Sequence, residues 1–110
     1  MEEYDLAILG GGPGGYVAAI RAAQLGLTTA IIDQDKLGGI CLNWGCIPTK
    51  ALLKNAEVLD TVKNAKYFGI NIPSYKVDFA KTIRRSRQTS TRLSKGIDFL
   101  MEKNKITQII

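Results

Sequence analysis

Five glycines and one proline fill positions 10–15 (GGGPGG), and this run constrains the fold more than any other part of the sequence. The residues directly before it form a short apolar run, as in a buried strand of a parallel sheet. The residues after it are rich in alanine, carry apolar side chains at helical spacing, and end at Gly26, which suits a helix cap. The sequence therefore predicts a strand over 4–9, a tight turn, and a helix over 14–25.

The turn contains the pattern G-x-G-x-x-G at Gly10, Gly12 and Gly15. In such a strand–turn–helix unit the first glycine permits the turn, the second lets a pyrophosphate approach the backbone, and the third allows close packing of helix on strand. A β-branched, apolar strand is predicted over 28–33, and Asp33 ends it, where an acid accepts hydrogen bonds from a ribose. This context favours a dinucleotide site over a flexible glycine turn with a surface aspartate. NAD and FAD both remain possible ligands of such a site.

Two further helices and the start of a third strand are predicted in the rest of the chain. The first helix runs from about 46 to 64, and the second from about 78 to 103. On the second, five apolar residues lie close to one face: Phe79, Ile83, Leu93, Ile97 and Leu100. The third strand begins near 106, and the chain ends inside it. The pattern predicts an α/β fold of the Rossmann-like FAD/NAD(P)-binding type, a parallel sheet with helices, of which this chain holds an incomplete part.

Composition bounds the class of protein. The chain has 110 residues, of which 45% are hydrophobic and 23% charged, a net charge of +5, two cysteines and no histidine. These values describe at most one small globular domain, and no stretch is long and apolar enough to span a bilayer. Acids stand near the N-terminus where a signal peptide would be basic, so a cytoplasmic location is expected. In that compartment a cysteine pair is more typical of a catalytic or metal site than of a structural staple.

The two cysteines, Cys41 and Cys46, are separated by four residues. Two ligands without any histidine cannot complete a four-coordinate zinc site, so no metal is expected. If the sulfurs pair, the backbone between them must leave ideal helix geometry, and Asn43 and Gly45 tolerate such departures. Pro48 suits the first turn of a helix, which puts Cys46 near a helix start that stabilises a thiolate. Two buried, inert thiols remain the alternative.

Three segments together resemble the FAD-dependent pyridine nucleotide-disulfide oxidoreductases: the glycine pattern with Asp33, LGGICLNWGCIPTKALL over 37–53, and VDFAKTIRRSRQTSTRLSKGIDFLMEKNK over 77–105. The resemblance covers the whole chain and is closest to the branch that oxidises dihydrolipoamide in 2-oxoacid dehydrogenase complexes. It implies that Cys41 and Cys46 form a redox-active disulfide, which takes electrons from dihydrolipoamide and passes them through FAD to NAD. A glutathione or mercuric reductase-like member and a non-catalytic dinucleotide-binding module are the alternatives.

The resemblance also implies individual roles. Cys41 exchanges with the dithiol substrate and Cys46 lies against the flavin. Asp33 binds the adenosine ribose, a place where the family usually has glutamate. Lys50 lies near flavin N5, where a cation stabilises reduced flavin. The residues implied to bind FAD are Gly10, Gly12, Gly15, Asp33, Gly38, Gly39, Cys46 and Lys50.

Comparison with the family indicates what this chain lacks. Family members are several times longer and add later strands of the FAD domain, a nicotinamide domain and an interface domain. Their general base is a histidine from the other subunit of a homodimer, and this chain contains no histidine. We therefore expect residues 1–110 to be the N-terminal segment of the FAD-binding domain and to be inactive alone. The partners implied are dihydrolipoamide, or the lipoyl domain that carries it, with no nucleic acid and no membrane.

A nucleic-acid-binding module is the remaining alternative. Residues 81–95 hold six cations and no acid, which is the charge pattern of such a surface. The stretch lacks the aromatic or base-reading side chains that recognition requires. A solvated helix face explains it better.

Overall fold

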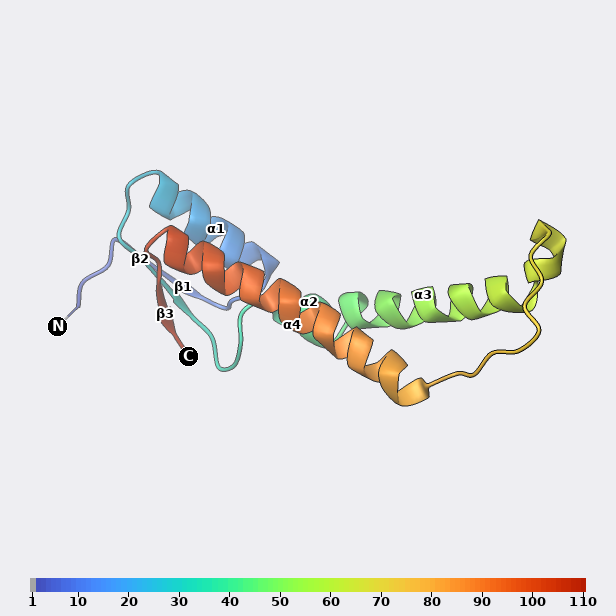
Figure 1. The fold of residues 1–110 in the computed structure, drawn as a ribbon. Helices are drawn as coiled ribbons and strands as arrows, with labels where there is room; N and C mark the ends of the chain where they lie inside the picture. The colour runs from blue at the N-terminus through green and yellow to red at the C-terminus, as the bar shows by residue number, and fades with distance from the viewer. Residues whose placement is uncertain (1) are drawn as a thin grey trace.

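The computed structural model describes residues 2–110. Within that range three strands form a parallel sheet in the order β1 (Leu6–Leu9), β2 (Thr29–Ile32) and β3 (Thr107–Ile109). Ala7 pairs with Ala30, and Ile31 pairs with Gln108. Helices connect the strands (Figure 1), which confirms the predicted α/β class with a parallel sheet.

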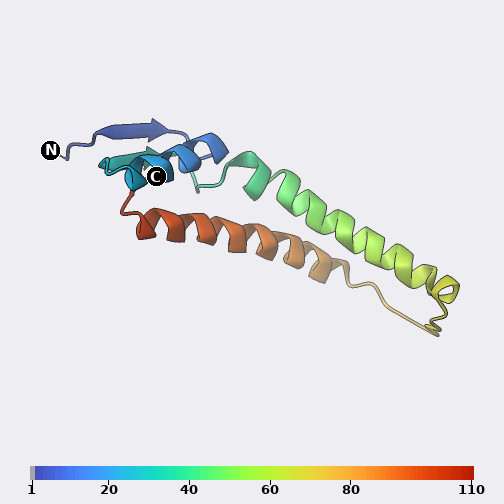
Figure 2. The ribbon, with the colours of Figure 1, turned by 90° about the horizontal axis from the view of Figure 1, so that it is seen from above.

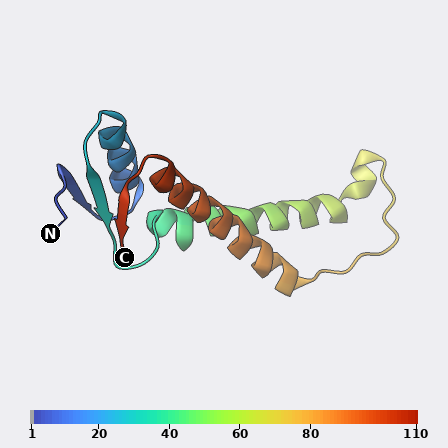
Figure 3. The same ribbon diagram turned by 60° about the vertical axis from the view of Figure 1, so that its left-hand side comes forward.

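Helix α1 (Pro13–Gln24) connects β1 to β2, and α4 (Phe79–Lys103) leads into β3. Figure 3 shows α1 and the C-terminal half of α4 on the same face of the sheet. The hydrophobic core lies between these two helices and the strands, because each contributes its apolar side there. Its buried members are Ala19, Ile31, Leu37, Ile97, Met101 and Ile106.

A helical hairpin extends away from the sheet (Figures 1 and 2). It consists of α3 (Cys46–Lys63), the short 3-10 helix η1 (Ala65–Phe68), a connection without regular structure, and the N-terminal half of α4. The hairpin makes the molecule elongated, with extents of 66 × 24 × 18 Å and a radius of gyration of 19.8 Å. A compact domain of this length has a radius of gyration of about 13 Å.

Most of the apolar residues near one face of α4 are exposed in the structure. Of the five apolar residues expected on that face only Ile97 is buried, whereas Phe79 is 68% exposed and Ile83, Leu93 and Leu100 are exposed as well. Toward α3 and the preceding segment α4 instead presents three buried serines: Ser86, Ser90 and Ser94. Small side chains at these three positions let the helix backbones approach closely.

The helix bounds differ from the predicted ranges by at most one residue at either end, as helix ends commonly do. The predicted 14–25 compares with Pro13–Gln24, 46–64 with Cys46–Lys63, and 78–103 with Phe79–Lys103. The structure adds η1 and a five-residue helix α2 (Gly39–Asn43), neither of which was predicted. Among residues 2–110, no helix combines the length and the apolar character needed to cross a membrane.

Candidate functional site

The glycine turn between β1 and α1 requires glycine at two of its positions. Gly10 has φ +105°, a conformation that side chains disfavour, and its amide donates to the carbonyl of Ile32 (2.8 Å). A Cβ atom on Gly15 would lie 1.8 Å from the carbonyl oxygen of Gly10. Helix α1 therefore starts directly against the turn, and a side chain on Gly15 would displace it, whereas a side chain on Gly10 would strain the backbone.

Gly12 differs from these two because it borders open space. A Cβ atom there would meet only the Cα of Gly39, at 3.8 Å. Gly12 is the N-cap of the twelve-residue α1, and no side chain caps this end. The first intrahelical hydrogen bond runs from Tyr16 N–H to Gly12 O (2.9 Å), so the amides of Gly14 and Gly15 lack helical acceptors. This combination of free amides, helix dipole and missing side chain fits a pyrophosphate.

Asp33 follows β2 and turns back to the glycine turn. The Gly11 amide donates to its Oδ2 (2.6 Å), and the Asp35 amide donates to its Oδ1 (3.2 Å). These hydrogen bonds, that of Gly11 first, hold the pKa of Asp33 below its ordinary value of 3.8. Sequence reasoning missed Gly11, where a Cβ atom would lie 2.3 Å from a methyl carbon of Leu37. The glycine at the variable position between Gly10 and Gly12 was the available signal.

Gly38 and Gly39 bring the next segment against the same turn. Their φ angles are +114° and +76°, and the Gly38 amide donates to the carbonyl of Gly11 (2.8 Å). A Cβ atom on Gly39 would lie 3.0 Å from the Cα of Gly12. Two glycine-rich segments, far apart in the sequence, thus form one backbone surface beside the start of α1.

Cys41 and Cys46 form a disulfide, with their Cα atoms 4.7 Å apart. Cys41 lies in α2, Cys46 is the first residue of α3, and both are exposed. The helix is broken between them at Trp44 and Gly45, where a Cβ atom on Gly45 would lie 3.0 Å from the Cα of Cys41. The glycine therefore permits the approach that pairing needs.

The role predicted for Asn43 in this break is wrong. Asn43 stays within α2, is buried, and donates from its side-chain amide to the carbonyls of Leu37 (3.0 Å) and Gly39 (3.1 Å). It therefore holds the turn that precedes the disulfide, a function that requires its amide group.

The start of α3 favours negative charge on Cys46. The first backbone hydrogen bond of α3 joins Thr49 N–H to Gly45 O (3.2 Å), so the amides of Cys46 and Ile47 lack helical acceptors. Gly45 has no side chain to cap them. A thiolate at this position interacts favourably with both the free amides and the helix dipole. Lys50, exposed and one turn further along α3, adds a positive charge on the same side.

The fold and the site together define a class of protein. A parallel α/β domain presents a glycine cradle at a helix start, and Gly39, which touches that cradle, lies two residues before an exposed disulfide. This is the arrangement of a dinucleotide-binding domain that carries an accessible cysteine pair. Apart from Lys50, the predicted site residues thus lie on three short segments of the chain, which are 10–15, 33–41 and the start of α3.

Comparison with known proteins identifies the family. Residues 4–110 match the family described as "Pyridine nucleotide-disulphide oxidoreductase", and the chain belongs to it. The proteins of this family use FAD and NAD.

The chain is similar to proteins named dihydrolipoyl dehydrogenase. It is 60% identical to that of Rhizobium etli over 106 residues, 56% identical to that of Zymomonas mobilis over 110 residues, and 53% identical to that of Bacillus subtilis over 104 residues. These alignments cover 96%, 98% and 94% of this chain. They cover 22%, 23% and 22% of the relatives, so the chain spans less than a quarter of their length.

Proposed function

We propose that this chain is the FAD-binding and disulfide-bearing part of an enzyme that oxidises dihydrolipoamide to lipoamide. The observation that carries the proposal is the exposed Cys41–Cys46 disulfide, which follows directly on the backbone contact between Gly12 and Gly39. The names of the relatives support this substrate over the disulfides of glutathione or mercuric reductase-like enzymes. The pairing of the two cysteines and the exposure of both residues argue against two buried, inert thiols.

FAD fits the residues that are present. Gly12 leaves room for a pyrophosphate, and the amides of Gly14 and Gly15 are free to bind it. Asp33 accepts one amide on each carboxylate oxygen, which leaves a lone pair on each for a ribose hydroxyl. When bound, FAD supplies an acceptor for two electrons. Cys46 and Lys50, at the start of α3, are the residues we assign to the flavin end.

The chain's own part in the reaction is thiol–disulfide exchange. A thiolate of the dithiol attacks the sulfur of Cys41, the bond between Cys41 and Cys46 breaks, and Cys46 leaves as a thiolate. The second substrate thiol, after losing its proton, attacks the mixed disulfide, closes the lipoamide ring and releases Cys41. The two electrons from the substrate remain on the protein as the reduced pair of Cys41 and Cys46. The free amides at the start of α3 make Cys46 the better leaving group, which assigns attack to Cys41.

A complete turnover needs groups outside this chain. The dithiol must lose two protons, and this sequence has no histidine to accept them. We therefore assign the base, the NAD site and the remaining strands of the FAD domain to further polypeptide, and we propose a homodimer as the active form. The lipoyl domain of a 2-oxoacid dehydrogenase complex is the proposed partner, and the cytoplasm the proposed location.

The test is reduction of the disulfide by one equivalent of dihydrolipoamide. Alkylation followed by peptide mass spectrometry should find both cysteines labelled, and the substrate should be recovered as lipoamide. The chain alone should make no NADH. The same experiment with reduced glutathione is the control for a general surface disulfide. Equal rates with glutathione and dihydrolipoamide at equal thiol concentration would contradict the proposed substrate.

A further inference from the structure

Two buried serines of α4 hold the two halves of the segment that carries the disulfide. The hydroxyl of Ser94 donates to the carbonyl of Leu37 (3.2 Å), in the turn that precedes α2. The hydroxyl of Ser86 donates to the carbonyl of Pro48 (3.0 Å), in the first turn of α3. Ser86 is 1% exposed and Ser94 is 7% exposed, so water has little access to either bond. One helix thus contacts the chain on both sides of the break between α2 and α3.

Two arginines of α4 add to these contacts. Arg87 donates from Nη1 to the carbonyl of Asn43 (3.4 Å), the last residue of α2, where a helix leaves carbonyls without helical donors. Arg85 donates from Nη1 to the carbonyl of Ala51 (3.0 Å) and to Oδ1 of Asn55 (2.9 Å). Positions 94, 87, 86 and 85 of α4 therefore bond in turn to positions 37, 43, 48 and 51. The residues at both ends of this series lie on one continuous helix, which fixes their spacing.

The disulfide is the second link between the two halves. While it is intact, the bond between Cys41 and Cys46 joins α2 to α3 across the break. Reduction removes that bond and leaves the backbone through Trp44 and Gly45 as the covalent connection. Glycine makes such a connection conformationally free. After reduction, the hydrogen bonds from α4 are what hold the start of α3 beside α2.

We propose that Ser86 is a positioning residue for the redox pair. It ties the first turn of α3 to α4, so that the thiol of Cys46 stays close to that of Cys41 after reduction. Holding two reacting groups in place raises their effective concentration, which favours closing of the disulfide. The inference rests on the proposed function, because a pair that cycles between disulfide and dithiol must close again in every turnover.

The test measures the equilibrium between the chain and a glutathione redox buffer. Two molecules of reduced glutathione reduce the bond between Cys41 and Cys46 and leave as oxidised glutathione, so two electrons and two protons pass to the chain. Acid quenching, alkylation and mass spectrometry then give the fraction reduced. Ser86→Ala should raise the equilibrium constant for reduction by about three- to tenfold, the effect of losing one hydrogen bond. This corresponds to a reduction potential about 15 to 30 mV higher.

Ile106→Val separates positioning from a general loss of stability. Ile106 is 6% exposed and belongs to the hydrophobic core, beyond the C-terminal end of α4. Removing one buried carbon there should lower stability about as much as Ser86→Ala does. It should leave the equilibrium constant for reduction unchanged, because Ile106 makes no contact with the disulfide segment through these hydrogen bonds.

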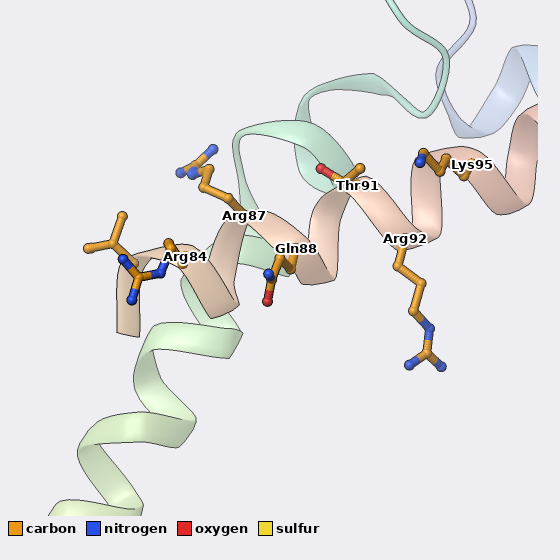
Figure 4. Close-up of a pocket in the computed structure, with 7 residues that line it drawn as sticks. Arg84, Arg87, Gln88, Thr91, Arg92 and Lys95 are labelled. Carbon is orange, nitrogen blue, oxygen red and sulfur yellow. The ribbon is translucent and has the colours of Figure 1, made fainter. Parts of the chain in front are cut away.

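Arg87→Gln is the second variant in case Ser86→Ala does not fold, which circular dichroism checks. Arg87 is exposed, and its substitution removes the bond to the carbonyl of Asn43. It should raise the equilibrium constant for reduction by about twofold. Arg92→Gln removes the same charge from the same helix, and Figure 4 shows Arg92 pointing to the opposite side of α4 from Arg87. Arg92→Gln should leave the constant unchanged.

Amide hydrogen exchange gives an independent readout. With the disulfide intact, Ser86→Ala should exchange the amides of residues 50–53 in α3 at nearly the wild-type rate, because the S–S bond still holds the start of the helix. After reduction these amides should exchange several-fold faster in Ser86→Ala than in the reduced wild type. Ile106→Val should show no such difference between its two redox states.

Three results would overturn the proposal. The first is a wild-type equilibrium constant in a folded Ser86→Ala, or in Arg87→Gln if Ser86→Ala does not fold. The second is an equal shift in Ser86→Ala and Ile106→Val, which would mean that the constant follows overall stability. The third is a lower constant in Ser86→Ala, which would mean that α4 favours the open dithiol. Failure of the proposed function would appear instead as no reduction by dihydrolipoamide, which this measurement does not use.

Discussion

The amide of Gly11 donates a 2.6 Å hydrogen bond to Oδ2 of Asp33, which joins the turn after β1 to the end of β2. The contact holds the carboxylate beside the glycine cradle, although 22 residues separate the two in the sequence. It also lowers the pKa of Asp33, so the carboxylate affects stability as well as ligand binding.

Stability should fall in acid partly through Asp33. Because its folded pKa lies below the ordinary value of 3.8, the unfolded chain binds more protons in acid. The stabilisation is present above about pH 4 and is lost as the pH falls through the folded pKa. Asp33→Asn should therefore reduce the slope of the unfolding free energy against pH in acid, as measured by urea denaturation.

Asp5→Asn is a second variant for the same measurement of unfolding free energy against pH. Hydrogen bonds from the hydroxyl and the amide of Thr28 lower the pKa of Asp5 in the same way. The double variant Asp5→Asn with Asp33→Asn should have a smaller slope than either single variant. A slope in Asp33→Asn equal to that of the wild type would show that the hydrogen bond from Gly11 does not affect the titration.

Gly15→Ala should destabilise the fold by about 2 to 3 kcal/mol, because its methyl group would lie 1.8 Å from the carbonyl oxygen of Gly10. Gly14→Ala, on the same helix, has nothing within 4 Å of the added atom and should stabilise by about 0.5 to 1 kcal/mol. Chemical denaturation measures both. Equal stabilities of the two variants would contradict the close contact of α1 with the turn.

The serines of α4 give a third prediction. Ser86→Ala should cost about 0.5 to 1.5 kcal/mol, because it removes the hydrogen bond to the carbonyl of Pro48, which then keeps only its helical donor within α3. Thr89→Ala is the control, since the Thr89 hydroxyl donates to the carbonyl of Arg85 within the same helix (2.9 Å). That variant should change stability by less than about 0.5 kcal/mol. A neutral Ser86→Ala would mean that the serine contact does not join α3 to α4.

The two sulfurs should differ in reactivity once reduced. In Cys41→Ser the remaining Cys46 lies at the start of α3, where its thiolate is stabilised, so it should react with iodoacetamide several-fold faster at pH 6 than Cys41 does in Cys46→Ser. Alkylation rates measured by mass spectrometry test this. Faster reaction of Cys41 would reverse the two assigned roles.

Local rules predicted the glycine turn well. The roles of Gly10 and Gly15 follow from a backbone that must turn sharply and then pack against itself, and these constraints lie within six residues. The strands and helices on either side follow from apolar periodicity in the same way. Such features need no knowledge of distant parts of the chain.

Contacts between distant segments could not be predicted. The packing face of α4 depends on what covers it, and the sequence contains no sign that Ser86 and Ser94 would lie against the carbonyls of Pro48 and Leu37. Likewise Lys36 Nζ lies 5.0 Å from the ring centroid of Trp44, a cation–π contact that requires the fold to be known.

We propose that FAD binds in the cradle around Gly12. Titration of FAD into the chain, followed by flavin fluorescence, should give saturable binding that is tighter than that of NAD. Gly12→Ala should weaken it by at least about tenfold, because the methyl group fills the space where the pyrophosphate would lie. The added atom meets only the Cα of Gly39, at 3.8 Å, so stability should not fall. Gly96→Ala on α4, with nothing within 4 Å of the added atom, should keep the wild-type affinity. Unchanged FAD affinity in a folded Gly12→Ala, or tighter binding of NAD than of FAD by the wild type, would contradict the account.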